Sequence, residues 1–411
     1  MILTVALLAA AFDVVALVDS LDFAQQYDIE KSEGNLQVLE HVLRTSATDV
    51  WWRDKGGGRL RYPSKEEAYP LSEFPFDRHI VPCEDVFGHL RLDRPKANPF
   101  PLVRRECARR GLGFGLHTTW EETHNLISLT SSWTLNHPQF WCCMNGRKPF
   151  LATCSIAYPE VVAHKLRLVD ERLALGPGTI FLDLARDGSW SVMREFVKPM
   201  TDEWRRRYGC EPPTTNDVRW TALVSEPVTA YLKQFAARCH AQGCRFVLGL
   251  RDMEDIGSVY RRYGIDWRKL ATDGTIDAVV AMWFVYDRAN AWNSIEAIYR
   301  KVMSARGKAD VYFPLSAYNF GGVGYPNLAR TLGISEAEAV RRLLRLAKDV
   351  GGRGVVMECV DYGNYSPAVC QAIRGFLLEM SAQQGKDKVK VMGDEIRKWN
   401  ASDVQVAEEV L

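Results

Sequence analysis

Short apolar runs that each end in a charged or polar residue recur along the chain. Residues 179–183, Thr-Ile-Phe-Leu-Asp, show the pattern most clearly, because an uninterrupted apolar run ends in Asp183. Continuous apolar runs of this length are typical of parallel strands that are buried on both faces. Amphipathic stretches of helical period separate the runs, which indicates strands that are connected by helical crossovers.

Eight strand–helix pairs follow one another in this pattern. The predicted strands are 14–18, 48–52, 111–117, 178–183, 244–250, 276–282, 309–314 and 353–358. The predicted helices are 33–45, 98–110, 158–175, 225–242, 254–263, 292–306, 335–350 and 366–380. This alternation favours an α/β fold, a (β/α)8 TIM barrel, over an open doubly wound sheet. An open sheet would show a Gly-rich phosphate turn after its first strand, where this chain has Asp19-Ser20-Leu21-Asp22-Phe23.

Three connections that follow strands are too long for plain crossovers, namely 53–97, 118–157 and 184–224. In a TIM barrel the loops after the strands gather on the face that holds the active site. These three loops are rich in Trp, Tyr, Arg and Pro rather than in Gly and Ser. Such a composition predicts ordered walls around a cleft.

The barrel is expected to span residues 13–382, between an apolar leader over 1–12 and a charged tail over 383–411. The leader ends in Ala9-Ala10-Ala11, as the apolar part of a secretory signal does, yet it has no Lys or Arg and is too short to span a bilayer. It is either the remnant of a signal peptide or a simple lead-in. The first interpretation is slightly favoured and predicts an exported or periplasmic protein.

Charge and cysteine spacing narrow the classes of ligand. Lys plus Arg number 52 and Asp plus Glu number 51, and no dense basic block interleaves with aromatics, so neither nucleic acid nor an anionic membrane surface is an expected partner. None of the ten cysteines stands in CxxC spacing, and His117 and His124 do not make a helical i, i+4 pair. No metal and no cofactor are therefore expected.

Several short motifs resemble a known family. They are Asp49-Val50-Trp51-Trp52-Arg53 with Gly57-Gly58-Arg59 and Tyr62-Pro63-Ser64, the segment from Gly111 to Trp120, Asn136-His137-Pro138-Gln139-Phe140, Ala157-Tyr158-Pro159-Glu160-Val161, and Phe181-Leu182-Asp183-Leu184-Ala185-Arg186. Together they resemble the glycosyl-hydrolase-like barrel proteins related to family 10 glycosidases, over residues 12 to 380. The resemblance implies a (β/α)8 barrel that acts on carbohydrate.

The chain departs from family 10 xylanases at their catalytic positions. Those enzymes carry glutamates at strands four and seven, whereas strand four here ends in Asp183 and strand seven in Pro314-Leu315-Ser316. Their catalytic pair is therefore not carried over to this chain.

Glycoside hydrolysis needs two carboxyl groups that flank the scissile bond. Asp183 is the first candidate, because a carboxylate at the end of an apolar strand is costly to bury unless a specific partner holds it. Arg186 is the expected partner and would keep Asp183 ionised as nucleophile or base. A purely structural Asp–Arg pair that closes the barrel top is the alternative.

Glu358 is the leading candidate for the second carboxyl group. Val355-Val356-Met357 directs it to the same mouth from the last strand, and apolar surroundings would suit a general acid. It could instead accept a hydrogen bond from a substrate hydroxyl or anchor an Arg. The competitors for its role are Asp252, Glu254 and Asp287.

Further residues at or just beyond the strand ends are candidates for contact with the substrate. Sugar rings stack their apolar faces on aromatic side chains, and sugar hydroxyls bond to Arg and carboxylates. The candidates are Asp19, Trp52, Arg53, His117, Trp120, Glu121, Arg186, Arg251, Asp252, Trp283, Tyr286 and Tyr318. Core packing is the alternative for about half of the aromatics at strand ends.

These observations predict a glycoside hydrolase that cleaves an oligo- or polysaccharide by a two-carboxylate mechanism. Two alternatives stay open, a non-catalytic carbohydrate-binding barrel and a metal-dependent deacetylase or amidohydrolase. The geometric expectation is that one concave face is lined by Asp19, Arg53, His117, Asp183, Arg251, Trp283 and Glu358.

Overall fold

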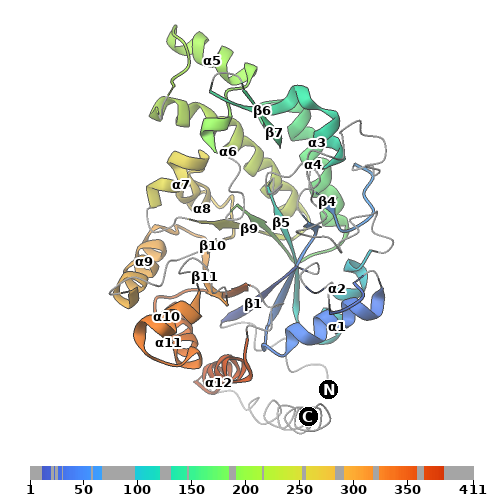
Figure 1. Ribbon diagram of the computed structural model, residues 1–411, viewed down its shortest axis with the longest axis vertical. Helices are drawn as coiled ribbons and strands as arrows, with labels where there is room; N and C mark the ends of the chain where they lie inside the picture. The colour runs from blue at the N-terminus through green and yellow to red at the C-terminus, as the bar shows by residue number, and fades with distance from the viewer. Residues whose placement is uncertain are drawn as a thin grey trace.

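The computed structural model describes residues 12–19, 23, 26–29, 31–56, 59–66, 98–120, 131–145, 148–184, 191–214, 217–251, 256–282, 291–317, 324–358 and 365–383. Eight parallel strands close into a barrel in the order β1-β12-β11-β10-β9-β8-β5-β2 (Figure 1). The strands are β1 (Asp13–Val18), β2 (Asp49–Arg53), β5 (Gly113–Thr119), β8 (Thr179–Asp183), β9 (Arg245–Leu250), β10 (Ala278–Ala281), β11 (Asp310–Ser316) and β12 (Gly354–Glu358). The predicted TIM barrel is confirmed.

Helices surround the barrel. Those that correspond to the predicted crossovers are α1 (Ser32–Leu43), α2 (Phe100–Arg109), α4 (Pro159–Ala174), α6 (Val218–Ala241), α7 (Ile256–Tyr263), α9 (Ala291–Ala305), α11 (Glu336–Asp349) and α12 (Pro367–Gln383). Two short helices, α8 (Trp267–Thr272) and α10 (Tyr325–Leu332), add to them. The predicted start of α6 at 225 was wrong. The helix begins at Val218, because the Asp217 side chain caps it by accepting from the Arg219 N–H at 2.8 Å.

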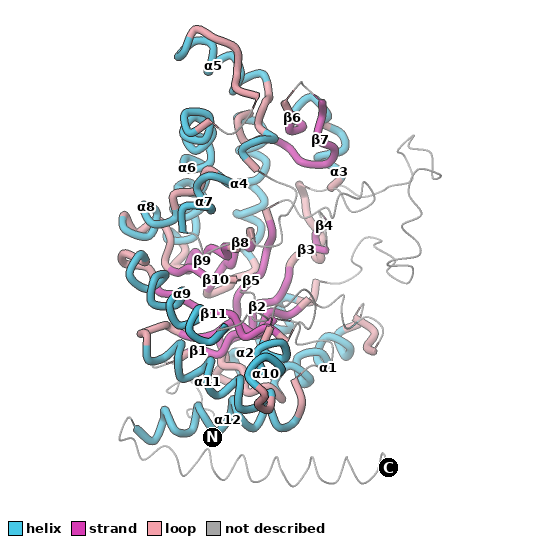
Figure 2. The backbone as a smooth tube through the Cα atoms, turned by 60° about the vertical axis from the view of Figure 1, so that its left-hand side comes forward, coloured by secondary structure: helices cyan, strands magenta, loops and turns pink. Residues whose placement is uncertain are grey.

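The long connections after the strands carry structure of their own. The first begins with the hairpin of β3 (Lys55–Gly56) and β4 (Arg59–Leu60). The second holds α3 (Ser132–Asn136), the 3-10 turn η4 (Pro138–Phe140) and the antiparallel strands β6 (Trp141–Met144) and β7 (Lys148–Cys154). The third holds η5 (Val192–Arg194) and α5 (Lys198–Tyr208). The second and third extend the molecule on the side of α4 and α6 (Figures 1 and 2).

Alternation along the strands divides the core into two layers. One layer fills the barrel lumen and consists of Val15, Leu17, Trp51, Phe181, Val247, Ala278, Val280, Met282, Tyr312 and Val356. The other lies between the strands and the helices and includes Val14, Trp52 and Leu182. Successive strand residues point to opposite faces, so every second residue of each strand belongs to the lumen.

The lumen is packed with aromatic rings and is not a pore. The Trp51 ring lies 5.2 Å from Phe181 and 5.5 Å from Tyr312, measured between centroids. Two glycines make room for these rings, because a Cβ at Gly115 would stand 2.6 Å from the Trp51 ring and one at Gly249 would stand 2.6 Å from Phe181. The packed rings form a floor beneath the carboxyl ends of the strands.

The amino end of the described chain joins the core. Phe12, which the sequence assigned to the leader, is buried and packs edge-to-face on Phe376 of α12, with ring centroids 5.2 Å apart. Residues 1–11 and 384–411 lie outside the described residues. Within the described part of the chain, no helix is long and apolar enough to cross a membrane.

Candidate active site

The carboxyl ends of the strands bring charged side chains to one mouth of the barrel. Each of these residues stands two positions after a residue that faces the lumen, as Arg53 follows Trp51 and Asp183 follows Phe181, so it faces the lumen as well. The set that shares this position consists of Asp19, Arg53, His117, Asp183, Arg251 and Glu358. The structure thus gathers six sequence candidates from six different strands.

Asp183 and His117 form the most buried pair at this mouth. The Asp183 side chain is fully buried, that of His117 is 2% exposed, and His117 Nε2 lies 3.1 Å from Asp183 Oδ2. The register of neighbouring strands explains the contact, because β5 pairs with β8 so that Thr119 stands beside Asp183. When Nε2 carries the ring proton, it donates to the carboxylate and stabilises the ionised form. Sequence reasoning named both residues but missed their contact.

Asp19 and Arg53 make a second pair on the neighbouring strands β1 and β2. Arg53 Nη1 donates to Asp19 Oδ2, and the two side chains are 5% and 11% exposed, in the order Arg53 and Asp19. The pairing of Leu17 with Trp51 in the sheet aligns the two strand ends and brings the charges together. A buried pair of this kind holds both side chains in one geometry.

Glu358 comes to the mouth from the opposite side of the barrel. β12 and β8 are separated by four steps around the closed ring of eight strands, so Glu358 faces Asp183 across the barrel axis. The residue is 3% exposed. Its backbone is held in place by Tyr365, whose hydroxyl donates to the Glu358 carbonyl at 3.0 Å.

Two predicted substrate contacts do not lie at this mouth. Trp52 is fully buried between the barrel and the helices, because its neighbour Arg53 takes the lumen side of β2. Trp120 points outward from the end of β5, and its ring meets Tyr231 of α6 at 5.1 Å between centroids. Strict alternation from Arg53 and from His117 would have placed both tryptophans correctly, and it would have identified Trp51 as the tryptophan that faces the lumen.

The remaining predicted contacts have no described position. They are Glu121, Arg186, Asp252, Trp283, Tyr286 and Tyr318, together with the competing carboxylates Glu254 and Asp287. The suggested pairing of Asp183 with Arg186 thus lies outside the described residues. In the part of the chain that is described, no group of three or more His, Cys, Asp and Glu side chains could hold a metal ion.

No family model and no curated protein matches the chain. Among solved structures, the PgaB (BpsB) glycoside hydrolase domain from Bordetella bronchiseptica superimposes with a TM-score of 0.59 at 12% identity, covering 88% of this chain and 98% of that one. A beta-galactosidase from the psychrophilic Marinomonas ef1 gives 0.56 at 10% identity, covering 93% of this chain and 62% of that one. The C-terminal domain of a putative chitinase from Desulfitobacterium hafniense DCB-2 gives 0.50 at 9% identity, with coverages of 89% and 98%.

Similarity at such low identity shows the fold alone. The chain is a (β/α)8 barrel of the shape that these glycoside hydrolases share. The particular resemblance to family 10 is not shown by these comparisons.

Proposed function

We propose that this protein is a glycoside hydrolase that cleaves an oligo- or polysaccharide with two carboxyl groups at the barrel mouth. The observation that carries the proposal is the placement of Asp183, which is fully buried at the end of β8, in contact with His117, and across the barrel axis from Glu358. Two carboxyl groups on opposite sides of one cleft are the arrangement that glycoside hydrolysis requires. The fold shared with glycoside hydrolases supports the same conclusion.

Asp183 is proposed as the ionised partner. The His117 contact stabilises a carboxylate that would otherwise be costly to remove from water. An ionised Asp183 acts either as nucleophile toward the anomeric carbon or as the base that takes a proton from the attacking water.

Glu358 is proposed as the general acid. Burial favours the neutral form of a carboxyl group, and a protonated Glu358 gives its proton to the leaving glycosidic oxygen. The Asp19–Arg53 pair and Arg251 lie at the same mouth and are proposed to hydrogen-bond sugar hydroxyls. Water is the second substrate: its oxygen adds to the anomeric carbon as the glycosidic bond breaks, and the reaction needs no cofactor.

The test is turnover of a panel of aryl glycosides and polysaccharides by variants of the two carboxyl groups. Asp183→Asn preserves shape but removes the charge, so kcat should fall by about a thousandfold while ligand affinity stays within about tenfold. In Glu358→Gln, kcat should fall less with aryl glycosides that have good leaving groups than with polysaccharides, because a good leaving group needs less protonation.

The matched control removes a buried carboxylate at the other end of the barrel. Asp13 is 4% exposed and lies at the amino end of β1. Asp13→Asn should lower stability by about 2 kcal/mol and leave the kcat of the folded protein unchanged.

Three results would overturn the proposal. Normal turnover by both active-site variants would remove Asp183 and Glu358 from the reaction. Sugar binding without cleavage by the wild type would identify a carbohydrate-binding barrel. Loss of activity in EDTA with recovery on zinc would identify a metal-dependent deacetylase or amidohydrolase.

A further inference from the structure

Thr119 is the last residue of β5 and stands next to the proposed catalytic carboxylate. Its backbone lies beside that of Asp183 in the sheet, where neighbouring strands are about 4.8 Å apart. Residues that lie side by side in a sheet point to the same face, and Asp183 faces the lumen. Thr119 also stands two positions after His117, whose ring packs on Phe181 in the lumen. The Thr119 side chain therefore points to the barrel mouth.

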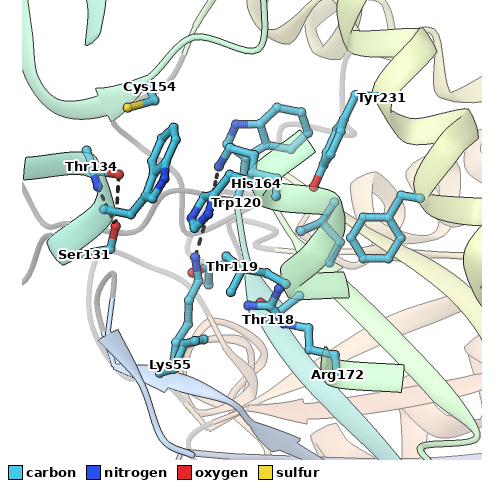
Figure 3. A pocket seen from close by; sticks show the side chains of 16 residues that line it. Lys55, Thr118, Thr119, Trp120, Ser131, Thr134, Cys154, His164, Arg172 and Tyr231 are labelled. Atoms are coloured by element: carbon cyan, nitrogen blue, oxygen red, sulfur yellow. Dashed lines mark hydrogen bonds between the residues drawn. The ribbon is translucent and has the colours of Figure 1, made fainter. Parts of the chain in front are cut away.

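The neighbours of Thr119 in the chain point the other way. Thr118 and Trp120 lie on the outer face of β5 and line a pocket of about 50 Å³ outside the barrel wall (Figure 3). Lys55 and Lys165 line the same pocket. Thr119 borders the pocket at the strand end, but alternation along β5 directs its side chain to the mouth. The two threonines therefore present their hydroxyls to opposite faces of one strand.

The Thr119 hydroxyl is buried and lacks a hydrogen-bond partner. The residue is 3% exposed, and nothing in the described part of the chain bonds to its Oγ1 atom. A buried hydroxyl without a partner costs free energy, so such groups are usually completed by water or by a ligand. Asp183 beside it is fully buried as well. Two groups at this depth are within reach of a water molecule rather than of a sugar ring.

The two proposed catalytic carboxyl groups come from opposite strands. β8 carries Asp183 and β12 carries Glu358, and the two strands are four steps apart in the closed ring of eight. Four steps are the largest separation that such a ring allows. Inverting glycosidases hold their carboxyl groups roughly 6.5–9.5 Å apart so that a water fits beside the base, whereas retaining enzymes hold them about 5–5.5 Å apart. Opposite strands favour the wider spacing.

We propose that Thr119 and Asp183 together hold the attacking water, so that Asp183 is the base and the reaction inverts the configuration of the anomeric carbon. This inference rests on the proposed glycosidase function. The water donates one hydrogen to the Asp183 carboxylate and the other to Thr119 Oγ1, which leaves its lone pairs free for the attack. Its oxygen bonds to the anomeric carbon and Asp183 takes its proton, while the glycosidic bond breaks and Glu358 protonates the leaving oxygen.

The configuration of the product is the first test. Proton NMR of the sugar released from a 4-nitrophenyl glycoside, recorded before mutarotation, identifies the anomer that the wild type forms. The proposal expects the anomer opposite to that of the substrate. A product of retained configuration would overturn this inference and leave the glycosidase proposal intact, because Asp183 would then be the nucleophile. Absence of hydrolysis with every aryl glycoside and polysaccharide would reject both proposals.

Variants of Thr119 test its part in holding the water. Thr119→Val preserves the shape of the side chain and removes the hydroxyl, so kcat should fall about thirtyfold while KM changes by less than about threefold. Thr119→Ser keeps a hydroxyl and should recover about tenfold of the lost kcat. Removal of a buried hydroxyl that has no partner among the described residues should not lower the melting temperature of Thr119→Val.

Thr118→Val is the matched control. Thr118 is 1% exposed, and its Oγ1 atom likewise has no partner within the described chain, but it faces the pocket outside the barrel wall. Thr118→Val should keep kcat within about twofold of the wild-type value. Equal losses of kcat in the two valine variants would overturn the proposal, and so would an unchanged kcat in Thr119→Val. A raised KM with unchanged kcat in Thr119→Val would assign Thr119 to sugar binding instead.

Discussion

Both ends of the barrel bury charged groups, but they arrange them differently. At the amino end, Asp13 accepts from the Tyr312 hydroxyl at 2.7 Å and from Arg353 Nε at 2.8 Å. Arg245 extends this network of bonds. Its Nη1 donates to the Tyr312 oxygen at 3.1 Å, and its Nη2 donates to Asp310 Oδ2 at 2.8 Å. At the carboxyl end, Asp19 pairs with Arg53, whereas Asp183 contacts a histidine rather than an arginine.

This difference is consistent with a structural network at the amino end and with the proposed catalytic site at the carboxyl end. The bonds at the amino end cross between strands, so the network ties β1, β9 and β11 to the residue that precedes β12. Arginine does not lose its proton in proteins, so Arg245 and Arg353 keep their charge at all working pH values. Histidine, unlike arginine, can exist in its neutral form, so we propose that the contact of His117 with Asp183 can change during the reaction. The general division of TIM barrels into a stability face and a catalytic face agrees with this contrast.

The largest expected effect on stability comes from adding a side chain at Gly354, where β12 approaches the backbone of β1 at the amino end of the barrel. A Cβ at Gly354 would stand 2.1 Å from the backbone oxygen of Asp13, which the sheet holds in place. Gly354→Ala should therefore lower the free energy of unfolding by about 3 kcal/mol, and the folded fraction should keep its kcat. Urea unfolding and active-site-normalised kinetics measure the two quantities.

Gly375→Ala is the matched control. This glycine lies inside α12, and a Cβ there would meet no atom within 4 Å. Alanine favours the helix over glycine, so the variant should gain about 0.5 to 1 kcal/mol. A loss of stability in Gly375→Ala as large as in Gly354→Ala would contradict the account of a close approach between β1 and β12.

The second prediction removes one donor to a buried carboxylate at each end. His117→Phe keeps a ring against Phe181, whose centroid lies 5.1 Å from that of His117, but it removes the contact with Asp183. We expect kcat to fall about a hundredfold, with the pH profile shifted. Tyr312→Phe removes the hydroxyl next to Asp13 and should cost about 1 kcal/mol of stability without change in kcat.

We propose that His117 positions Asp183, and a conservative variant of His117 tests that role. Glutamine can donate from its side-chain amide but does not titrate, so His117→Gln should recover about tenfold of the lost kcat without restoring the original pH profile. Recovery of both would show that histidine titration has no part in the reaction. A fall in kcat of equal size in Tyr312→Phe would erase the contrast between the two ends.

The strands and the charged site residues could be predicted for the same physical reason. A buried parallel strand needs a continuous apolar run, and a charge at its end, such as Asp183 or Glu358, stands out against that run. An aromatic side chain suits either face of a strand, so composition alone could not choose between Trp51 and Trp52. Alternation along β2 from Arg53 supplies the choice: Trp51 lies on the lumen face with Arg53, and Trp52 lies on the face toward the helices.

Contacts between distant segments could not be predicted from composition or period. The contact of His117 with Asp183 depends on the register of β5 against β8, which no local pattern specifies. Lys55 comes from a hairpin and Lys165 from a helix, and the two share an acceptor only because the β3–β4 hairpin and α4 both reach the end of β5. The pocket therefore became visible only in the folded chain.

The smallest predicted effect concerns Asp49, on the lumen face at the amino end of β2. Burial, followed by the charge of Asp13, raises the pKa of Asp49 to about 6, from an ordinary value of 3.8. The Thr48 hydroxyl, which donates at 2.9 Å, and the more distant Arg245 and Arg353 oppose this shift. Because the folded state binds this proton more tightly than the unfolded state, the contribution of Asp49 favours folding at low pH and declines as the pH rises from about 4 to about 6.

Asp49→Asn should therefore stabilise the protein at neutral pH and not at low pH. The replaced carboxylate also interacts with Thr48, Arg245 and Arg353, so we expect a net gain of only about 1 kcal/mol above pH 6.5 and no gain near pH 4. Urea unfolding of wild type and variant at pH 4, 5, 6 and 7 measures the difference directly. A difference that is constant across this range would show that folding does not shift the pKa of Asp49, and burial beside Asp13 would then have no effect on its protonation.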